Sequence, residues 1–513
     1  MSTANRVIKN TGWLYAKMAI TMFVSLYTTR LILNGLGASD FGIFNIVGGA
    51  IAMLGFLNAA MAGATQRFMS YAEGEGNKEK QKYIFNISVV LHAAISVIIA
   101  IALIIAGYFF FNGILNIPGE RINAAKVVYA SLIVSTMLTV INVPYDAVMN
   151  AHENMKYYAV VGFLESLLKL SVAFACVYTA YDKLIVYGIL MACIPLVTLT
   201  IMKIYCHRHY EECVIAPVKY WDKSLIKEMI SFGGWNLAGS MGALLGNYGN
   251  GIVLNNFFGT ILNAALGLAA QLNGMLLVFS NNMLKALNPV IVKKEGQGNR
   301  QRMLEYSYTG CKFSFLLFAL FCLPCFVEAP YVLKLWLKNY PEWTVLFVRY
   351  QIVRTLLEQL TITLGTSLAA TGKIREVSIA TFVLDLLPIL VLSLAFYGGA
   401  SPAWFFPIVI FLMVLVTTAV RLYYCRKYCD LSLRHFVQQV LLPCMFVSVV
   451  LLSLGGCINI FMDKGMMRLL VNSVIMTLFF LPVSWTILNN EERAVLIKLK
   501  EKIYNTFKTR QTK

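Results

Sequence analysis

The sequence predicts an all-α integral membrane protein with about fourteen transmembrane helices, in two pseudo-symmetric six-helix bundles followed by two further helices. The first observation is composition: 58% of the 513 residues are apolar and 13% are charged, whereas soluble proteins carry about 25% charged residues. The second is a series of apolar segments of spanning length, and the third is an internal repeat. Together they argue against soluble enzymes, disordered scaffolds and secreted disulfide modules.

Apolar segments of spanning length follow one another along the whole chain. A helix that crosses a bilayer needs about 20 mostly apolar residues. The predicted spans lie at roughly 12–33, 41–62, 84–111, 122–145, 155–180, 184–206, 229–257, 260–288, 306–328, 345–371, 374–398, 402–425, 436–460 and 467–488. Because the basic start runs into the first segment without a small-residue cleavage signal, we expect a retained span and not a cleaved leader.

Lysine and arginine are unevenly divided between the two sets of loops. Loops on the side of the termini hold about 29 of the 43 basic residues, and the opposite loops hold about 7. Since basic loops stay on the cytoplasmic side, both termini are predicted to be cytoplasmic. The basic residues are not interleaved with aromatic residues in one domain, so we expect no nucleic-acid partner.

An internal repeat divides the chain. AEGEGNKEK (72–80) matches KEGQGNRQR (294–302) and Gly12–Trp13 matches Gly234–Trp235 at one and the same offset, and AHENMK (151–156) matches ATGKIR (370–375) at a nearly equal one. Both copies start on the same side of the membrane, so the repeat is parallel, as in transporter halves that rock about a shared site. The repeat therefore favours alternating access over an enzyme or a receptor.

The repeat sets the expected domain organisation. We expect an N-terminal six-helix bundle (1–206), a cytoplasmic linker loop (207–228), a C-terminal six-helix bundle (229–428), two additional transmembrane helices (429–490) and a basic amphipathic cytoplasmic tail (491–513). A plain solvated tail is the alternative for the last segment.

Amide side chains recur inside predicted spans. An amide that faced lipid would lack hydrogen-bond partners, so these residues are predicted to line a polar cavity that suits a hydroxyl-rich sugar. The candidates are Asn236, Asn247, Asn250, Asn281 and Gln351. Small residues interleaved with them have close helix packing as their alternative role.

The charges inside predicted spans lean cationic, which favours an anionic substrate held through a phosphate. The candidate cations are Arg354, Arg349, Lys285, Lys17 and Arg30. Each has a structural alternative, because a basic side chain can form a local ion pair or extend to the lipid headgroups.

Acidic residues in the spans are candidate proton or sodium sites, namely Glu358, Asp385 and Glu165. Glu165 lies one turn from Lys169, and Glu358 one turn from Arg354, so local ion pairing is the alternative. The sequence holds no phosphate-cradling Gly-rich loop followed by lysine, no serine elbow and no HExxH helix. We therefore expect no catalytic residue, metal or cofactor, and a transporter that is driven by a gradient.

Several segments resemble a known family. TRLILNGLGASDFGIF (29–44) is similar to the TR…LG…D[FY]G…[FY] signature of polysaccharide exporters, and TQRFMSYAEGEGN (65–77) resembles the segment after their second span. NVPYDAVMNAHENMKYYA (142–159) and LAATGKIR (368–375) resemble their loops after spans 4 and 10. The best match is the Wzx-type O-antigen and polysaccharide flippases of the MOP exporter superfamily, whose relatives include MATE drug exporters.

This resemblance implies two bundles around a V-shaped cavity in a bacterial inner membrane. The implied activity moves undecaprenyl-diphosphate-linked oligosaccharide, as used for O-antigen and lipopolysaccharide, from the inner to the outer leaflet. A polysaccharide polymerase or glycosyltransferases would be candidate partners, and the chain itself is expected to be a monomer. The family's cavity charges vary in position, so only their role carries over, although Arg30 matches the signature arginine.

Two other functions remain open at this point. A MATE-like cation-coupled multidrug antiporter would need an acidic, aromatic-lined pocket, whereas the charges in the spans here lean positive. A membrane glycosyltransferase or polymerase would need a sizeable extramembrane loop with acidic catalytic residues, and the loops opposite the termini are short.

Overall fold

The computed structural model describes residues 3–52, 55–114, 117–494 and 497, and all regular elements among them are helices. Eleven of the described helices are long and apolar enough to cross a membrane. Of the three further predicted spans, the described part of 41–62 is divided between the second arm of a kinked helix and the helix that follows it. The span 260–288 lies on one arm of a 74-residue helix, and 345–371 falls on a pair of shorter helices. The fold is that of a multi-pass membrane protein, as the composition predicts. Most of the predicted tail, 491–513, lies outside the described residues.

The chain divides into two compact units. The N-terminal unit comprises Asn10–Leu237 and Gly296–Gly298, and the C-terminal unit comprises Met1–Lys9, Ala238–Glu295 and Asn299–Lys513. Each is described separately below. The boundaries predicted from the sequence remain a prediction.

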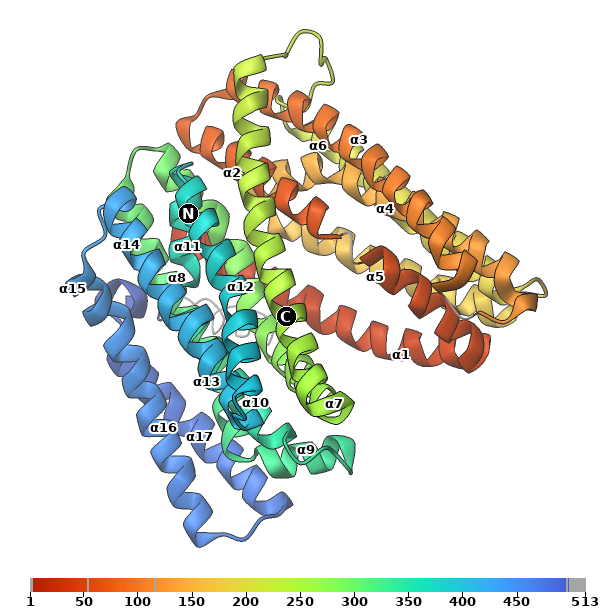
Figure 1. The fold of residues 1–513 in the computed structure, drawn as a ribbon. Coiled ribbons are helices and arrows are strands. Elements are labelled where there is room, and N and C mark those ends of the chain that lie inside the picture. The colour runs from red at the N-terminus through yellow and green to blue at the C-terminus, as the bar shows by residue number, and fades with distance from the viewer. Residues whose placement is uncertain (1–2, 53–54, 115–116, 495–496, 498–513) are drawn as a thin grey trace, which may run out of the picture. The chain divides into compact units, whose positions relative to one another are not determined.

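Besides residues 223–237 of a longer helix, the N-terminal unit contains six helices, the first from Asn10 on, and two short helical turns (Figure 1). These are α1 (Thr3–Ala52), α2 (Gly55–Glu75), α3 (Lys78–Phe109), η1 (Phe110–Ile114), η2 (Gly119–Arg121), α4 (Ile122–Ala151), α5 (Met155–Tyr178) and α6 (Lys183–His209). Helix α4 packs against α2, α3 and α6. It is therefore the central helix of this unit.

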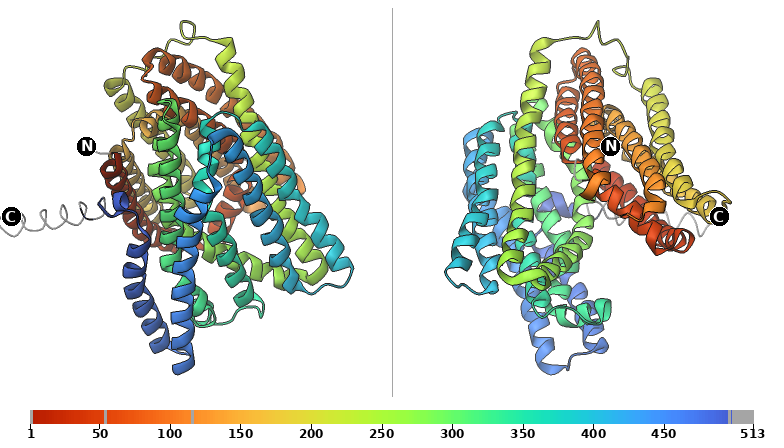
Figure 2. Two further views of the ribbon diagram at one scale, coloured as in Figure 1. Left: turned by 90° about the vertical axis from the view of Figure 1, so that its left-hand side faces the viewer. Right: turned by 45° about the vertical axis from the view of Figure 1, so that its right-hand side comes forward.

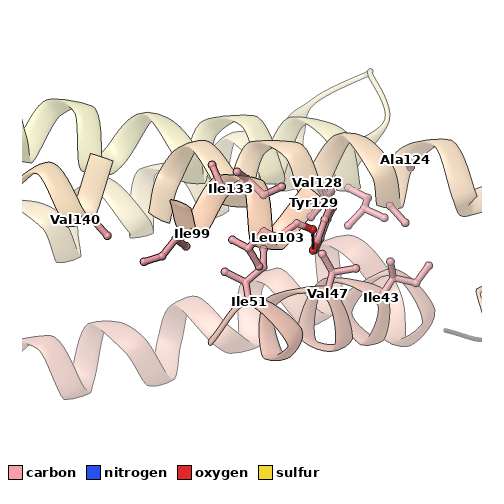
Figure 3. Close-up of a cluster of buried hydrophobic side chains, with 13 residues drawn as sticks. Ile43, Val47, Ile51, Ile99, Leu103, Ala124, Val128, Tyr129, Ile133 and Val140 are labelled. Carbon is pink, nitrogen blue, oxygen red and sulfur yellow. Dashed lines mark hydrogen bonds between the residues drawn. The ribbon is translucent and has the colours of Figure 1, made fainter. Parts of the chain in front are cut away.

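Figure 3 shows the apolar core that holds α1, α3 and α4 together. Val47 from α1, Leu103 from α3 and Val128 from α4 are each fully buried in this cluster. Tyr129 adds a polar anchor, because its hydroxyl donates a 2.6 Å hydrogen bond to the carbonyl oxygen of Leu103. Side chains that are buried between helices must satisfy such polar atoms internally.

The C-terminal unit begins within α7 (Lys223–Gly296) and continues to the end of the described chain. Its other elements are α8 (Arg300–Val327), α9 (Ala329–Leu337), α10 (Thr344–Gln359), α11 (Ile362–Ala370), α12 (Arg375–Tyr397), η3 (Pro402–Trp404), α13 (Phe405–Val409), η4 (Ile410–Val416), α14 (Thr417–Cys429), α15 (Leu433–Phe436), η5 (Val437–Leu441), α16 (Leu442–Phe461) and α17 (Met466–Ile487). Helix α8 packs against α10, α11, α16 and α17, and 67% of its apolar window is buried. It is the central helix of this unit.

Helices α1 and α7 each bend at one glycine, where the sequence predicts a loop between two spans. Gly37 in α1 has φ 79° and ψ 167°, and Gly259 in α7 has φ 80° and ψ −176°. Only glycine adopts this region of backbone space without strain. The two arms of α7 turn back on each other at this bend (Figures 1 and 2), and Asn263 on the second arm faces Gly251 on the first.

The positions of the two bends match the internal repeat, because Gly259 follows Gly37 at the same spacing that separates Asn299 from Asn77. The predicted repeat loops also match in geometry. Asn77 and Asn299 each cap the helix that follows, accepting a hydrogen bond from the amide three residues on at 2.9 and 3.1 Å. The glycine before each asparagine has φ 70°. A common backbone therefore underlies the sequence repeat.

The third repeat segment shows the same agreement. Glu153 has φ 56°, and Gly372, its counterpart in the matching segment, has φ 79°. A left-handed conformation is costly for a glutamate and not for glycine. The backbone of Glu153 is held by a 2.8 Å hydrogen bond from the side-chain amide of Asn10 to its carbonyl oxygen.

Candidate functional site

Arg354 on α10 connects two other predicted site residues in the C-terminal unit. Its Nε donates a 3.0 Å hydrogen bond to Glu358, one turn along the helix, and its Nη1 donates a 3.3 Å bond to the side-chain oxygen of Asn247 on α7. The guanidinium therefore holds α7 against α10. The ion pair with Glu358 means that Arg354 does not stand as an isolated positive charge.

Asp385 on α12 belongs to the same group. It faces α7 where two glycines allow close approach: a Cβ at Gly242 would lie 3.4 Å from the Asp385 carboxylate, and one at Gly246 would overlap its carbonyl group. Small residues permit this backbone contact between membrane helices. The charges of Arg354 and Glu358 act on the Asp385 carboxylate.

Arg421 on α14 completes the group and is a residue that the sequence analysis missed. Its Nη1 donates hydrogen bonds to the carbonyl oxygen and the hydroxyl of Thr361, at 3.1 and 3.0 Å. Thr361 lies at the break between α10 and α11, where main-chain oxygens lack helical partners. Because Arg421 falls inside the predicted span 402–425, a complete list of charges within spans would have found it.

We call Arg354, Glu358, Asp385 and Arg421, with Asn247, the charge cluster of the C-terminal unit. The cluster joins α7, α10, α12 and α14 through two basic and two acidic side chains. With both carboxylates ionised the charges balance, and protonation of one would leave a net positive charge. Such an arrangement can couple helix packing to the binding of a proton or a cation.

Arg349, another predicted cavity cation, lies elsewhere on α10. Its Nε donates a 3.1 Å hydrogen bond to the carbonyl oxygen of Phe326, and its Nη2 donates a 3.4 Å bond to that of Val327. These are the last residues of α8, where a cation stabilises the free carbonyl groups. Arg349 thus caps α8, and the structure does not join it to the charge cluster.

The amides of α7 are a conspicuous polar feature of the two predicted spans that this helix covers. The buried side-chain oxygens of Asn250, Asn255 and Asn273 accept no hydrogen bond from any described residue. The Asn250 amide nitrogen donates only a 3.6 Å bond to the sulfur of Met413. Asn281 is exposed on the second arm of the helix. Unsatisfied carbonyl oxygens at membrane depth favour a polar ligand or water beside them.

The remaining candidates in the C-terminal unit have less definite surroundings. Gln351 and Lys285 are half-buried on α10 and α7. In the N-terminal unit, Asn236 lies near α2, where a Cβ at Gly63 would be 3.5 Å from its amide nitrogen. The structure assigns no ligand to these residues.

Lys17 lies in a polar seam between α1 and α5 of the N-terminal unit. Its ammonium is 4.4 Å from the centre of the Tyr158 ring, and its side chain fills the space left by Gly162. One turn along, the hydroxyls of Thr21 and Ser166 lie 3.1 Å apart. Contact with an aromatic ring stabilises a cation without neutralising it.

The other two charged candidates of the N-terminal unit lie outside this seam. Glu165 accepts a 2.6 Å hydrogen bond from Lys169, so the two form the local ion pair that their spacing suggests. Arg30 is exposed on α1, and no ion pair or hydrogen bond joins it to another residue within the described ranges.

A polar cluster that sequence reasoning missed ties the loops of the N-terminal unit together. His152, just after α4, hydrogen-bonds Glu212 of the linker and lies 3.5 Å from Glu73 in the last turn of α2. Burial raises the pKa of Glu212, but the hydrogen bond and charge of His152, with Lys78, outweigh it and leave that pKa below its ordinary value. No local sequence signal points to these contacts, because the partners lie far apart in the chain.

Two buried ion pairs in the C-terminal unit were also missed. Lys312 on α8 donates a 2.8 Å hydrogen bond to Glu492, and both side chains are almost fully buried. Directly after α8, Glu328 forms a buried pair with Arg468 on α17, with 2.9 Å between the charged atoms. These pairs fix α17 and the segment after it to the central helix.

A comparison with protein families supplies context for this geometry. A family model described as polysaccharide biosynthesis protein matches residues 7–295. No curated protein gave a significant match to the chain.

Solved structures with similar folds are membrane transporters. An outward-facing multidrug resistance MATE family transporter of the MOP superfamily gives a TM-score of 0.69 at 14% identity, covering 84% of this chain and 96% of its own. A MOP superfamily transporter from Pyrococcus furiosus, described as having a binding pocket of reverse polarity, gives 0.68 at 15% identity, with 84% and 96% covered. A MATE structure in the bent conformation gives 0.69 at 16% identity, with 83% and 95% covered. At such identities the likeness establishes the fold alone.

Proposed function

Because the chain belongs to the polysaccharide biosynthesis protein family, we propose that it is a flippase for lipid-linked oligosaccharides. The substrate is an undecaprenyl-diphosphate-linked repeat unit, and it moves from the inner to the outer leaflet of a bacterial cytoplasmic membrane. The protein carries out transport and no covalent chemistry. The excess of basic residues in the loops on the side of the termini supports cytoplasmic termini.

The observation that carries this proposal is the set of unsatisfied amides on α7. Sugar hydroxyls both donate and accept hydrogen bonds, and each amide oxygen can accept one. Asn250 and Asn255 in the predicted span 229–257 and Asn273 in the span 260–288 offer three such oxygens, and Asn281 adds an exposed amide. A hydrophobic drug would leave them unpaired, at a cost that a polar sugar avoids.

The diphosphate needs cations, and the structure ranks the five candidates. Arg349 caps α8 and Arg354 is paired with Glu358, so both are already engaged. Lys17 contacts an aromatic ring and Arg30 is exposed, which leaves their charges available to phosphate oxygens. We propose either Lys17 or Arg30 of the N-terminal unit as the contact for the diphosphate, and Lys285 of the C-terminal unit as a separate candidate, while the polyprenyl chain remains in lipid.

The charge cluster of the C-terminal unit is the proposed coupling element. Uptake of a proton or a cation by Asp385 or Glu358 would change the electrostatic attraction of Arg354 and Arg421, and with it the packing of α7, α10, α12 and α14. Glu165 is a weaker candidate, because its exposed pair with Lys169 is self-contained.

Deletion of the gene in a cell that makes the oligosaccharide tests the proposal. Lipid-linked repeat units should accumulate on the inner leaflet, and the wild-type chain should restore export. A double variant with Asn250→Leu and Asn273→Leu should fail to restore it, whereas Asn123→Leu, at an exposed position, should succeed. If the deletion leaves export intact and removes resistance to cationic dyes, the drug antiporter replaces the flippase.

A further inference from the structure

The linker between the repeats is held rigidly against α3. The Asn86 side chain donates a 2.8 Å hydrogen bond to the carbonyl oxygen of Val214 and accepts a 2.7 Å bond from the amide of Ala216. Tyr220 is buried, and its ring packs edge-on against Tyr83 at 5.4 Å. The residues after Tyr220 are therefore presented on a fixed base.

A shallow groove of about 470 Å³ opens where the linker becomes α7. It is lined by Trp221, Lys223, Ile226, Lys227, Ile230 and Ser231. Trp221 and Ile230 are about half exposed, at 48% and 50%, and Val218 nearby is 94% exposed. Exposed aromatic and apolar side chains around the start of a predicted span, here 229–257, are typical of the interface between membrane and water.

Three exposed lysines lie along this segment, spaced about one helical turn apart in the sequence: Lys219, Lys223 and Lys227. The last two line the groove. Within the part of the chain that the structure describes, none of them forms an ion pair or donates a side-chain hydrogen bond to a protein group; Lys219 only stacks on the Tyr220 ring. The nearby carboxylate of Asp222 is engaged, since it accepts hydrogen bonds from the first amides of α7.

We propose that this groove binds an anionic phospholipid of the cytoplasmic leaflet. The headgroup phosphate lies among the lysine ammonium groups, and the upper acyl chain covers Trp221, Ile226 and Ile230. Charge complementarity selects the class of lipid: a zwitterionic headgroup brings its own cation toward three lysines, and an anionic headgroup does not. The site is independent of the proposed transport pathway and lies on the segment that continues into α7.

Lipid-specific quenching of Trp221 tests this site. The full chain is reconstituted in nanodiscs of phosphatidylcholine with a minor fraction of phosphatidylglycerol, with bromine on the acyl chains of one lipid or the other. The Trp221 signal is the difference between wild type and Trp221→Phe. We expect brominated phosphatidylglycerol to quench it beyond its mole fraction.

The lysines should account for that preference. Each lysine near a membrane surface contributes about a fivefold gain in affinity for anionic lipid, so Lys223→Gln with Lys227→Gln should reduce the preference by more than tenfold. The control with the same change in charge is Lys126→Gln with Lys464→Gln, at exposed positions near the opposite predicted side of the membrane, and it should retain the preference.

Two results would overturn the proposal. Quenching of wild-type Trp221 that follows mole fraction alone would show that the groove does not distinguish lipids. An undiminished preference in the Lys223 and Lys227 double variant would show that the lysines do not form the site. Should Trp221→Phe fail to fold, lipid adducts counted by native mass spectrometry on the lysine variants give the same comparison.

Discussion

Gly246 allows α7 and α12 to touch backbone to backbone, and a single added methyl group should separate them. A Cβ at this position would overlap the Asp385 carbonyl group, with the carbonyl carbon only 3.0 Å away. Main-chain atoms cannot rotate out of the way as a side chain can. Overpacking of this kind costs about 1–3 kcal/mol, and contact with backbone places Gly246→Ala near the upper end.

Gly267→Ala is the matched control, because both glycines lie inside α7 and no described atom lies within 4 Å of a Cβ at Gly267. Replacing glycine by alanine in a helix gains about 0.5–1 kcal/mol in each variant, so the difference between them isolates the clash. We expect Gly246→Ala to be less stable than Gly267→Ala by about 3 kcal/mol, roughly a factor of 100 in the unfolding equilibrium.

Unfolding by denaturant in detergent micelles, followed by circular dichroism, measures this difference. Transport by the same variants shows whether the displacement of Asp385 from the charge cluster matters for coupling. Equal stabilities for the two variants would refute the close approach of α7 and α12.

Three further predictions concern polar contacts. Glu492→Ala should lower the free energy of unfolding by about 3–5 kcal/mol, because it leaves the buried Lys312 without a carboxylate. The double change Lys312→Met with Glu492→Leu should restore most of this loss. A denaturation curve in which Glu492→Ala costs little would contradict the buried ion pair. Arg121 holds the pKa of Asp182 below its ordinary value of 3.8. This interaction therefore stabilises the fold above that pH, and the stabilisation is lost as the pH falls through the lower pKa of the folded state. The stability difference between wild type and Arg121→Ala should shrink in acid, and a difference that stays constant with pH would contradict the interaction. Tyr129→Phe should cost about 1 kcal/mol through its lost hydrogen bond, measured in the same way, and an unchanged midpoint would exclude that bond.

The repeat could be read from the sequence because its turns depend on local chemistry. A glycine with positive φ followed by an asparagine cap needs only neighbouring residues, so AEGEGN and KEGQGN mark the same structure in both copies. The bends at Gly37 and Gly259 use the same backbone freedom, and the sequence marks them as well, because Asn34–Gly35 and Asp40 flank the first and Asn255–Asn256 precede the second.

Long-range contacts of charged residues could not be predicted in this way. Lys312 and Glu492 lie far apart in the chain, and the hydropathy of α8 remains high despite the lysine. Arg349 was expected in a cavity because it is a charge within a span, and only the packing of α8 against α10 shows that it caps a helix. By contrast, the pairs Arg354–Glu358 and Glu165–Lys169 follow from one helical turn of spacing.

Flipping in a purified system tests the central proposal most directly. The chain is reconstituted into liposomes whose inner leaflet carries undecaprenyl-diphosphate-linked oligosaccharide, and a glycosidase added outside reports how much sugar reaches the outer leaflet. Wild-type protein should expose the sugar with time, while the Asn250 and Asn273 double variant should not. If the sugar stays protected with wild-type protein under an imposed ion gradient of either direction, this chain is not the flippase proposed here.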